Sequence, residues 1–380
     1  MAQREKLRIL QAVYCLGRGG AERLSIDITC QLQQIPDVEV LLISFDKTVN
    51  HEYSTEGINY LYCPSAVTLR VGKPAILKLD NYRAVLRNFK PHVIHSHRYL
   101  TEVITREEIQ PGVRYFTHFH DNIVQLKNAT LSTFTNKSQF TNFYEKVRLV
   151  KKYKACNNSF IAISEDTEAY CRNVLPHSFS NRIHLLHNSI NYHKFKRADN
   201  NRNTDKLHLL NIGSFTPKKN QQLLPDIVKS LLDKGIDTHL TMLGDGPLLQ
   251  KVKEKAGQMG LENYIHFAGN VDNVEDYLRN ANMYVHTATY EPFGLVLLEA
   301  MAAGLPVVSL DGHGNRNLIE NGNTGYIFTE PNPELFADHI VKLMSDTTLY
   351  NKIRSQADVF AGKHDIAQYV KQLITLYNNA

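Results

Sequence analysis

Several features that define other classes of protein are missing from this 380-residue sequence. Its five cysteines include no Cys-x-x-Cys pair and leave one unpaired, which argues against a disulfide framework or a zinc cage. The longest apolar stretch, Gly294 to Leu310, contains Glu299 and a Gly-Leu-Pro break, so it does not span a bilayer. The N-terminal apolar run is broken at Gln11, which favours a core strand over a signal peptide. We therefore expect a soluble, cytoplasmic protein.

Charge is unevenly distributed along the chain. Residues 1–200 contain 27 Lys and Arg against 18 Asp and Glu, whereas residues 201–380 contain 16 against 20. The net charge of +5 therefore combines a first half at +9 with a second half at −4. The two halves are expected to meet different partners, because a basic face suits nucleic acid, an anionic membrane or a phosphorylated substrate. An incidental division of charge is the alternative.

Short β-branched runs alternate with helical patterns, which is typical of parallel sheets covered by helices. The predicted strands are residues 7–14, 38–44, 93–95, 115–117 and 160–163 in the first half, and 207–212, 239–243, 265–267, 283–286 and 306–309 in the second. Residues 196–206 contain no apolar residue except one alanine, so we predict a polar linker there. The sequence thus predicts two α/β domains, residues 1–195 and 207–355, facing each other across a ligand-binding cleft.

A glycine-rich loop, residues 15–20, joins the first predicted strand to a helix that opens at Ala21. Glycines allow close backbone approach, and the helix N-terminus supplies free N–H groups, so the loop could bind an anion. Its spacing is not the G-x-G-x-x-G dinucleotide fingerprint, although Asp46 ends the second strand, where a nicotinamide enzyme places a ribose-binding acid. Anion binding and a plain tight turn are the two alternatives.

Two His-x-His pairs, His95/His97 and His118/His120, end later predicted strands. Alternation along a strand puts each pair on one face, which also suits metal binding. No Asp, Glu or Cys cluster with ligand spacing accompanies the pairs, so we predict no metal. One or two of these histidines are expected to project into the cleft, and His120 is the best candidate.

The segment EPFGLVLLEAMAAG, residues 291–304, carries two carboxylates. Its helix is predicted to start near Gly294 and to be buried because it is apolar on every side. Glu299 lies within that helix and needs hydrogen-bond donors or a cation, so it contacts ligand hydroxyls or forms a structural ion pair. Glu291 precedes the helix and would contact another part of one ligand. The N–H groups of Gly294 and Leu295 could hold a phosphate.

The loop GSFTPKKN, residues 213–220, follows the first strand of the second predicted domain. A lysine in this loop can supply positive charge to the same phosphate. We assign that role to Lys219 and predict that Lys218 is a solvated surface lysine.

Together these segments resemble the retaining glycosyltransferases of family 4, which have the two-domain GT-B architecture. The resemblance covers nearly the whole chain. The matching segments are GGAER (19–23), THFHD (117–121), IAISE (161–165), HNSI (187–190, opening a segment that ends at Phe195), LGDGP (243–247) and the Glu291-x7-Glu299 pair. The resemblance implies an acceptor-binding and a nucleotide-sugar-binding domain, both Rossmann-like, with a C-terminal helix at 356–380 packing back on the first domain.

The resemblance also implies a role for each site residue. By this correspondence Glu299 contacts the donor ribose, and Glu291 contacts the donor sugar or its surroundings. Gly294 and Leu295 bind the diphosphate alongside Lys219. On the first-domain side the implied site residues are Gly19, Gly20 and His120, the last beside the transferred sugar. The nucleotide base is held near Val271.

Two departures from the family pattern stand out. Ser214 occupies the position after the loop glycine where the family commonly has arginine. The later G-G-x-x-E loop also lacks its acid, because Gly314-Asn315-Arg316-Asn317 stands there, and Arg316 is expected to face the substrate. Both changes bear on specificity.

The implied reaction moves a sugar from a UDP- or GDP-linked donor to a glycan, lipid-linked or other hydroxyl acceptor, as in polysaccharide or glycoconjugate synthesis. No cofactor is expected, and without an Asp-x-Asp motif catalysis should be metal-independent. The basic stretches at 70–90 and 146–154 predict peripheral contact with an anionic membrane surface, a solvated helix face being the alternative. No aromatic-basic motif for nucleic acid is present. The rival functions are a catalytically weak partner subunit and a nicotinamide-dependent oxidoreductase.

Overall fold

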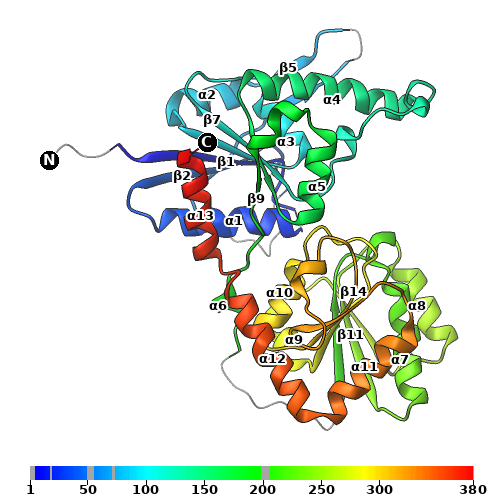
Figure 1. Cartoon of the computed structure of the whole chain (residues 1–380). Helices are drawn as coiled ribbons and strands as arrows, with labels where there is room; N and C mark the ends of the chain where they lie inside the picture. Colours follow the sequence, from blue (N-terminus) through cyan, green and yellow to red (C-terminus); the bar gives the residue numbers. More distant parts are fainter. Residues whose placement is uncertain (1–4, 18, 49–54, 71–72, 198–205, 380) are drawn as a thin grey trace. The chain divides into compact units, whose positions relative to one another are not determined.

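The computed structural model describes residues 5–17, 19–48, 55–70, 73–197 and 206–379. The chain forms two compact units (Figure 1). Unit 1 consists of residues 1–188 and 366–380, and unit 2 consists of residues 189–365. Each unit is built on its own parallel sheet, which confirms the predicted α/β fold of two domains.

The sheet of unit 1 has seven strands in the order β3-β2-β1-β6-β7-β8-β9, and every neighbouring pair is parallel. The strands are β1 (Leu7–Val13), β2 (Val38–Ser44), β3 (Tyr60–Tyr62), β6 (Val93–His97), β7 (Arg114–Phe119), β8 (Ser159–Ala162) and β9 (Ile183–Leu185). A separate antiparallel hairpin pairs β4 (Ala66–Thr68) with β5 (Ile76–Lys78).

Helices cover both faces of this sheet because its strands carry apolar side chains on both faces. Ile9 packs with α1 and α13, whereas the next residue, Leu10, packs in a separate cluster with α2. Figure 1 shows α1 and α13 side by side on one face. The helices are α1 (Gly20–Gln33), α2 (Asp80–Phe89), α3 (Tyr99–Thr105), α4 (Lys137–Ala155), α5 (Glu165–Val174) and α13 (Ile366–Asn379).

The sheet of unit 2 has six parallel strands in the order β12-β11-β10-β13-β14-β15. The strands are β10 (Leu207–Ile212), β11 (Thr238–Leu243), β12 (Ile265–Gly269), β13 (Met283–His286), β14 (Val307–Leu310) and β15 (Gly325–Phe328). The helices are α6 (Tyr192–Phe195), α7 (Leu224–Asp233), α8 (Leu249–Gln258), α9 (Val274–Asn280), α10 (Leu295–Ala302), α11 (Pro333–Ser345) and α12 (Thr347–Gly362).

Each sheet reverses its winding direction once. The reversal falls between β1 and β6 in unit 1 and between β10 and β13 in unit 2. Loops that leave two such strands diverge to opposite sides, which opens a crevice at their carboxyl ends where ligands of doubly wound sheets bind. The glycine loop follows β1, the histidines lie at the carboxyl ends of β6 and β7, and the lysine loop and Glu291 follow β10 and β13.

The structure divides the chain slightly before the predicted linker at residues 196–206. The chain enters unit 2 at residue 189, because α6 packs there: Phe195 is buried, and Tyr192 donates a hydrogen bond to Asp358 at 2.7 Å. Of the predicted linker, residues 198–205 lie outside the described residues. The polarity of the sequence could not show that the core of unit 2 begins before this segment.

The predicted boundary at residues 355 and 356 also differs from the structure. It falls inside α12, whose residues through Gly362 stay with unit 2, and only α13 packs on unit 1. Ile366, Val370 and Leu373 of α13 are buried there against α1 and β1. The sequence prediction also missed five of the described strands, β3, β4, β5, β9 and β15, which have only three or four residues each.

Candidate functional site

The loop after β10 is fixed to the loop after β13 in unit 2. The short 3-10 turn Pro217–Lys219 follows β10, and its Lys218 carbonyl accepts a hydrogen bond from the N–H of Thr289 at 2.9 Å. The Thr287 hydroxyl donates to the Lys219 carbonyl at 3.1 Å. These bonds join two chain segments about 70 residues apart at the reversal of the sheet, and they set the position from which the Lys219 side chain extends.

Lys219, Glu291 and His286 form a buried cluster at this point. The Lys219 ammonium lies 2.5 Å from Glu291 Oε2, and His286 Nε2 lies 3.1 Å from the same oxygen. Burial alone would raise the pKa of Glu291, but the Lys219 charge and the His286 hydrogen bond outweigh it and hold the pKa well below its ordinary value. Burial lowers the pKa of His286, with the Glu291 contact opposing. The cluster is thus a neutral imidazole and an ion pair.

The loop that follows β14 supports Glu291 from the other side. The N–H of Glu291 donates to the Gly312 carbonyl at 2.8 Å. A Cβ atom at Gly314 would lie 2.0 Å from the Pro292 carbonyl oxygen, so this close approach requires glycine. Asn315 is fully buried and accepts the Gly312 N–H at 2.8 Å. This loop departs from the family's G-G-x-x-E pattern, but it still positions Glu291.

Helix α10 carries Glu299, as the sequence predicted. Gly294 precedes it with φ of +103°, a conformation that favours glycine, and the helix side chains are almost all apolar and buried. Glu299 and Glu291 are each only 7% exposed. Burial raises the pKa of Tyr284, and the charges of both carboxylates add to that rise, so the two glutamates lie near one phenol. The N–H end of α10 and the Lys219–Glu291 pair belong to one region of unit 2.

The other predicted residues of unit 2 are placed as follows. Ser214 is exposed, and its carbonyl accepts a hydrogen bond from Gln221 at 3.0 Å. Val271 is half-buried just after β12. Arg316 is largely exposed, and its guanidinium binds Asp311 at 2.8 Å, so in the structure it pairs within its own loop.

In unit 1, α1 begins at Gly20 directly after Gly19, so its first N–H groups lie at the glycine loop. Glu22 in the first turn is buried and forms an ion pair with Arg98. Arg98 follows His97 and has φ of +70° with ψ of 157°, a strained backbone conformation for any residue other than glycine. Sequence reasoning missed this residue, whose only signal was a base directly after a His-x-His pair. Arg98 places a positive charge near His120.

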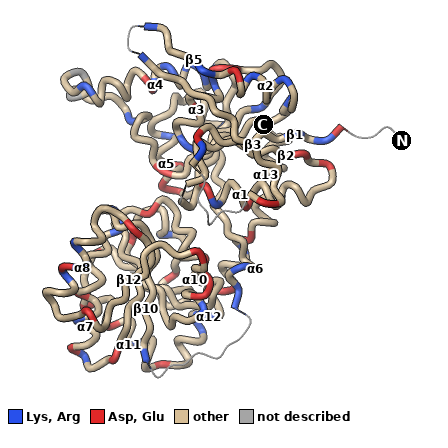
Figure 2. The backbone as a smooth tube through the Cα atoms, turned by 180° about the vertical axis from the view of Figure 1, so that it is seen from behind, with Lys and Arg blue, Asp and Glu red and all other residues tan. Residues whose placement is uncertain are grey.

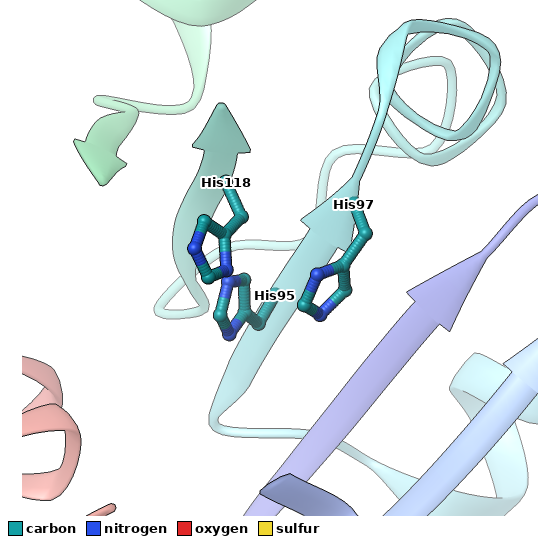
Figure 3. A group of neighbouring side chains, drawn as sticks. All are labelled: His95, His97 and His118. Carbon is teal, nitrogen blue, oxygen red and sulfur yellow. The ribbon is translucent and has the colours of Figure 1, made fainter. Parts of the chain in front are cut away.

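The two His-x-His pairs come together on one face of the sheet. His97 of β6 pairs in register with His118 of β7, and Figure 3 shows His95, His97 and His118 as neighbours. The ring centroids of His95 and His97 are 4.4 Å apart, and those of His118 and His120 are 4.1 Å apart. The structure thus brings together all four histidines that the sequence singled out.

Burial keeps this cluster neutral. It lowers the pKa of His118 to about 3, and it lowers the pKa values of the other three well below their ordinary range. Neutral imidazoles can ligate metal, and one nitrogen each from His95, His97 and His118 lies within 4.8 Å of the others. Both nitrogens of His97, however, are engaged in hydrogen bonds to Gln11 and His120. The observed contacts describe a stack of rings in which His97 is hydrogen-bonded at both nitrogens, whereas neither nitrogen of His118 has a hydrogen-bond partner among the described residues.

Two family profiles match consecutive parts of the chain. The profile described as Glycosyltransferase Family 4 matches residues 18–194, and the profile described as Glycosyl transferases group 1 matches residues 193–359. Together they include Gly19 and Gly20, the histidine stack, Lys219 and both glutamates. This chain belongs to glycosyltransferase family 4.

Individual relatives of this family 4 member differ in how much they align. An uncharacterized glycosyltransferase of Methanocaldococcus jannaschii is 26% identical over 93% of both chains. The N-acetyl-alpha-D-glucosaminyl L-malate synthase of Bacillus anthracis is 29% identical over 42% of this chain and 43% of its own length. The chain aligns with less than half the length of the first curated relatives that it matches.

Solved structures share the fold of this family 4 member. The Anabaena HepE protein in complex with UDP and glucose superposes with a TM-score of 0.76 at 18% identity, covering 98% of this chain and 100% of that one. TarM superposes with a TM-score of 0.77 at 13% identity, covering 100% and 99%. These neighbours have the GT-B architecture, which confirms the predicted fold class. Among the described residues, no helix has both the length and the apolar character needed to cross a membrane.

Acid is expected to destabilise unit 1 of this glycosyltransferase family member through the histidine stack. His118 has a pKa of about 3 when folded against 6.5 when unfolded, so between these values only the unfolded state binds the proton. The free energy of unfolding therefore falls as the pH drops below about 6.5, by up to about 1.4 kcal/mol per pH unit for each such histidine. Urea unfolding at pH 7.5 and 5.0 measures this. The His118→Leu variant should lose less stability on acidification, and equal losses would contradict the assignment.

Proposed function

We propose that the protein is a retaining glycosyltransferase that moves a sugar from a nucleotide-diphospho-sugar to a hydroxyl acceptor. The observation that carries this proposal is the buried Lys219–Glu291 pair beside the N-terminal end of α10, at the reversal of the unit 2 sheet. A diphosphate needs cationic and N–H donors, and a sugar needs acceptors for its hydroxyl groups. This region supplies both kinds of group.

Breaking the bond to the sugar builds negative charge on the departing diphosphate. Lys219 and the free N–H groups at Gly294 and Leu295 would stabilise that charge. Because these groups already supply positive charge, we expect metal-independent catalysis. Glu291 would contact the donor sugar and Glu299 the ribose, so the two carboxylates are not a glycosidase acid and nucleophile pair. The departing phosphate can then take the proton of the acceptor hydroxyl on the same face.

Unit 1 would bind the acceptor, a glycan, a lipid-linked saccharide or another hydroxyl compound. Its excess of positive charge suits an acceptor that carries phosphate or lies at an anionic surface. His120 would lie beside the transferred sugar, and Gly19 and Gly20 would close the unit 1 side of the site. The Anabaena HepE structures hold UDP and UDP-glucose, so UDP-sugars are the donors to test first, followed by GDP-sugars.

The deciding experiment incubates the purified full chain with a panel of UDP- and GDP-sugars and measures nucleotide release with and without candidate acceptors. Transfer with the anomeric configuration of the donor kept in the product, read by NMR, supports the proposal. Binding of a nucleotide-sugar without release or transfer would instead favour the partner-subunit alternative, which the exposed Ser214 motivates. Both family profiles favour sugar transfer over the nicotinamide alternative.

The Glu299→Gln variant tests the donor-ribose role. Glutamine keeps the shape but removes the charge, and a charged hydrogen bond contributes about 1.5–3 kcal/mol. Nucleotide binding should therefore weaken roughly 10- to 150-fold, at 1.4 kcal/mol per factor of ten. Isothermal titration with the free nucleotide measures this beside a melting curve. Unchanged affinity together with a stability loss of about 3–5 kcal/mol would show that Glu299 is half of a structural ion pair.

We further propose that unit 1 contacts an anionic membrane at the cytoplasmic face through α4. A cavity of about 580 Å³ adjoins this helix, and Phe143, Val147, Val150 and Leu175 line it together with three lysines. These lysines, Lys146, Lys151 and Lys154, form no ion pair with any described residue. Figure 2 shows Lys and Arg recurring along α4 and near β5. Lys146 donates a hydrogen bond to Asn128 at 2.7 Å but keeps its charge. Apolar walls with cations that no acidic group neutralises suit lipid headgroups.

Not every basic residue in the predicted membrane-contacting stretch at 146–154 is available to bind lipid. Arg148 and Lys152 both bind Glu107, at 2.7 and 3.0 Å, so they stabilise the docking of α4. The predicted membrane contact therefore rests on the other three lysines.

Reversing Lys151 and Lys154 to glutamate should greatly weaken binding to liposomes that contain anionic lipid. Each interfacial base contributes about 1 kcal/mol, and added salt should weaken binding of the unchanged protein. Reversing Lys251 and Lys352 of unit 2, which changes the net charge equally, is the matched control and should leave binding nearly unchanged. Cosedimentation measures both variants. Binding that ignores lipid charge, or that both variants lose equally, would contradict the membrane contact.

A further inference from the structure

A chain of hydrogen bonds leads from the core of unit 1 to His120. Gln11 of β1 is fully buried, and its side-chain oxygen Oε1 lies 2.7 Å from Nε2 of His97. The other nitrogen of His97, Nδ1, lies 2.8 Å from Nε2 of His120. His97 is the right-hand residue of the pair on one strand in Figure 3. No described residue makes a hydrogen bond to Nδ1 of His120, which is half-buried.

The amide nitrogen of Gln11 also forms hydrogen bonds. Its Nε2 group donates to Tyr377 of α13 at 3.1 Å and to Nδ1 of His95 at 3.2 Å. Tyr377 is fully buried, and its hydroxyl lies 2.6 Å from the same His95 nitrogen. The amide nitrogen therefore faces His95 and Tyr377, and the amide oxygen faces His97.

The chemistry of these groups sets the direction of each bond. An amide oxygen can only accept, so Nε2 of His97 must carry a proton. Burial keeps the His97 ring neutral, and a neutral imidazole carries one proton, so its Nδ1 is an acceptor. The partner at that nitrogen, Nε2 of His120, must then be the donor. The neutral ring of His120 then has its proton on Nε2 and a lone pair on Nδ1.

We propose that Gln11 and His97 are positioning residues that hold His120 in the tautomer with its lone pair on Nδ1. In this form His120 accepts a hydrogen bond from a hydroxyl group of the sugar or of the acceptor, and it cannot donate one from that nitrogen. The proposal rests on the proposed function for the identity of the ligand. The tautomer itself is a property of the ligand-free protein.

The first test is the tautomer, read from two-dimensional ¹H–¹⁵N spectra of the full chain with ¹⁵N-labelled histidine at pH 7.5. The His120 signals are those lost in His120→Gln. We expect an N–H at Nε2 and a bare Nδ1 on His120 in the unchanged protein. A proton on Nδ1 there overturns the proposal, whether or not the protein transfers sugar and whether or not any variant folds.

The second test removes the acceptor that orients the chain. Gln11→Met keeps the length of the side chain, and His120 should then populate both tautomers. Turnover with the nucleotide-sugar identified by the panel should fall about 2-fold or more, with KM for that donor nearly unchanged, because only the fraction of molecules with a lone pair on Nδ1 then accepts the hydrogen bond of the hydroxyl group. An unchanged His120 tautomer in folded Gln11→Met protein overturns the proposal.

Tyr377→Phe is the matched control. It removes a buried hydroxyl on the far side of Gln11 but leaves the bond between Oε1 and His97 in place. This variant should lose stability comparably to Gln11→Met yet keep the His120 tautomer and the turnover. Equal losses of turnover in both variants would show a merely structural role for Gln11. If His120→Gln transfers sugar at the normal rate, the role of His120 in the proposed function fails while the tautomer assignment stands.

Discussion

Replacing Lys219 with alanine is expected to lower turnover roughly 100- to 1,000-fold, the loss typical of removing one electrostatic donor from an active site. The Lys219 side chain is only 17% exposed and its ammonium lies 2.5 Å from Glu291. Its charge therefore acts where water screens it weakly, and a departing phosphate would depend on it strongly. Single-turnover sugar transfer measures the effect, with donor affinity determined separately.

Lys218→Ala is the control for this prediction. Lys218 is adjacent in sequence but exposed, and its ammonium lies 5.7 Å from the centre of the Tyr290 ring. Its backbone carbonyl, which fixes the loop, is kept in the variant. Turnover should therefore change little. Comparable losses in both variants would contradict the assignment of Lys219.

A stability effect must be separated from the catalytic one. Lys219→Ala leaves the buried carboxylate of Glu291 without its cation, which is destabilising. The double variant Lys219→Ala/Glu291→Gln removes that charge as well, so it should regain stability while turnover stays low. Recovery of turnover along with stability would show that Lys219 serves only to hold Glu291.

Much of the fold could be predicted from the sequence because parallel strands that are buried on both faces appear as short continuous apolar runs. The runs at 7–14, 38–44 and 207–212 correspond to β1, β2 and β10. The edge strands β3, β9 and β15 were missed because they are short and only partly buried. The equally short strands β8, β13 and β14 are buried along their whole length and were predicted. The boundary between the units was displaced for another reason. Whether a short helix such as α6 packs on the unit before it or on the unit after it depends on tertiary contacts.

The candidate site likewise contains residues that the sequence could predict and residues that it could not. Glu291, Glu299 and Lys219 stood out because charged residues flank or interrupt apolar segments, and Gly294 because it starts a helix. The partner His286 was hidden inside a strand, where a histidine resembles any buried residue. Arg98 and Gln11 were hidden because their roles depend on contacts with residues far away in sequence, Glu22 for one and His97 for the other.

A second large effect is expected in the core of unit 1, at Arg106. Its side chain is only 1% exposed and lies 3.2 Å from the fully buried carboxylate of Glu102. It donates hydrogen bonds to Asn158 and Ser96, each at 2.7 Å, and to the Phe116 carbonyl at 3.0 Å. Ser96 and Phe116 belong to β6 and β7, the two strands that carry the histidine stack. In the sequence Arg106 resembles an ordinary surface charge at a helix end.

Arg106→Met should lower the free energy of unfolding by about 3–5 kcal/mol, because it leaves a buried carboxylate without its cation. Burial raises the pKa of Glu102 to about 7 even with Arg106 present, against 4.5 when unfolded, and removing the cation raises the pKa further. A raised pKa favours the folded state below about 4.5, and that benefit is lost as the pH rises through the folded pKa. The deficit relative to the unchanged protein should therefore be larger at pH 8 than at pH 5.5.

Urea unfolding of the full chain at these two pH values measures the deficit in the Arg106→Met variant. The double variant Arg106→Met/Glu102→Gln should recover much of the loss at pH 8, since it carries no ionisable group at the site. Arg172→Met is the matched control, because its pair with Glu168 is exposed and should contribute no more than about 1 kcal/mol. A deficit that is the same at both pH values, or that Glu102→Gln does not relieve, would show that the packing of the Arg106 side chain stabilises the core and that its charge does not.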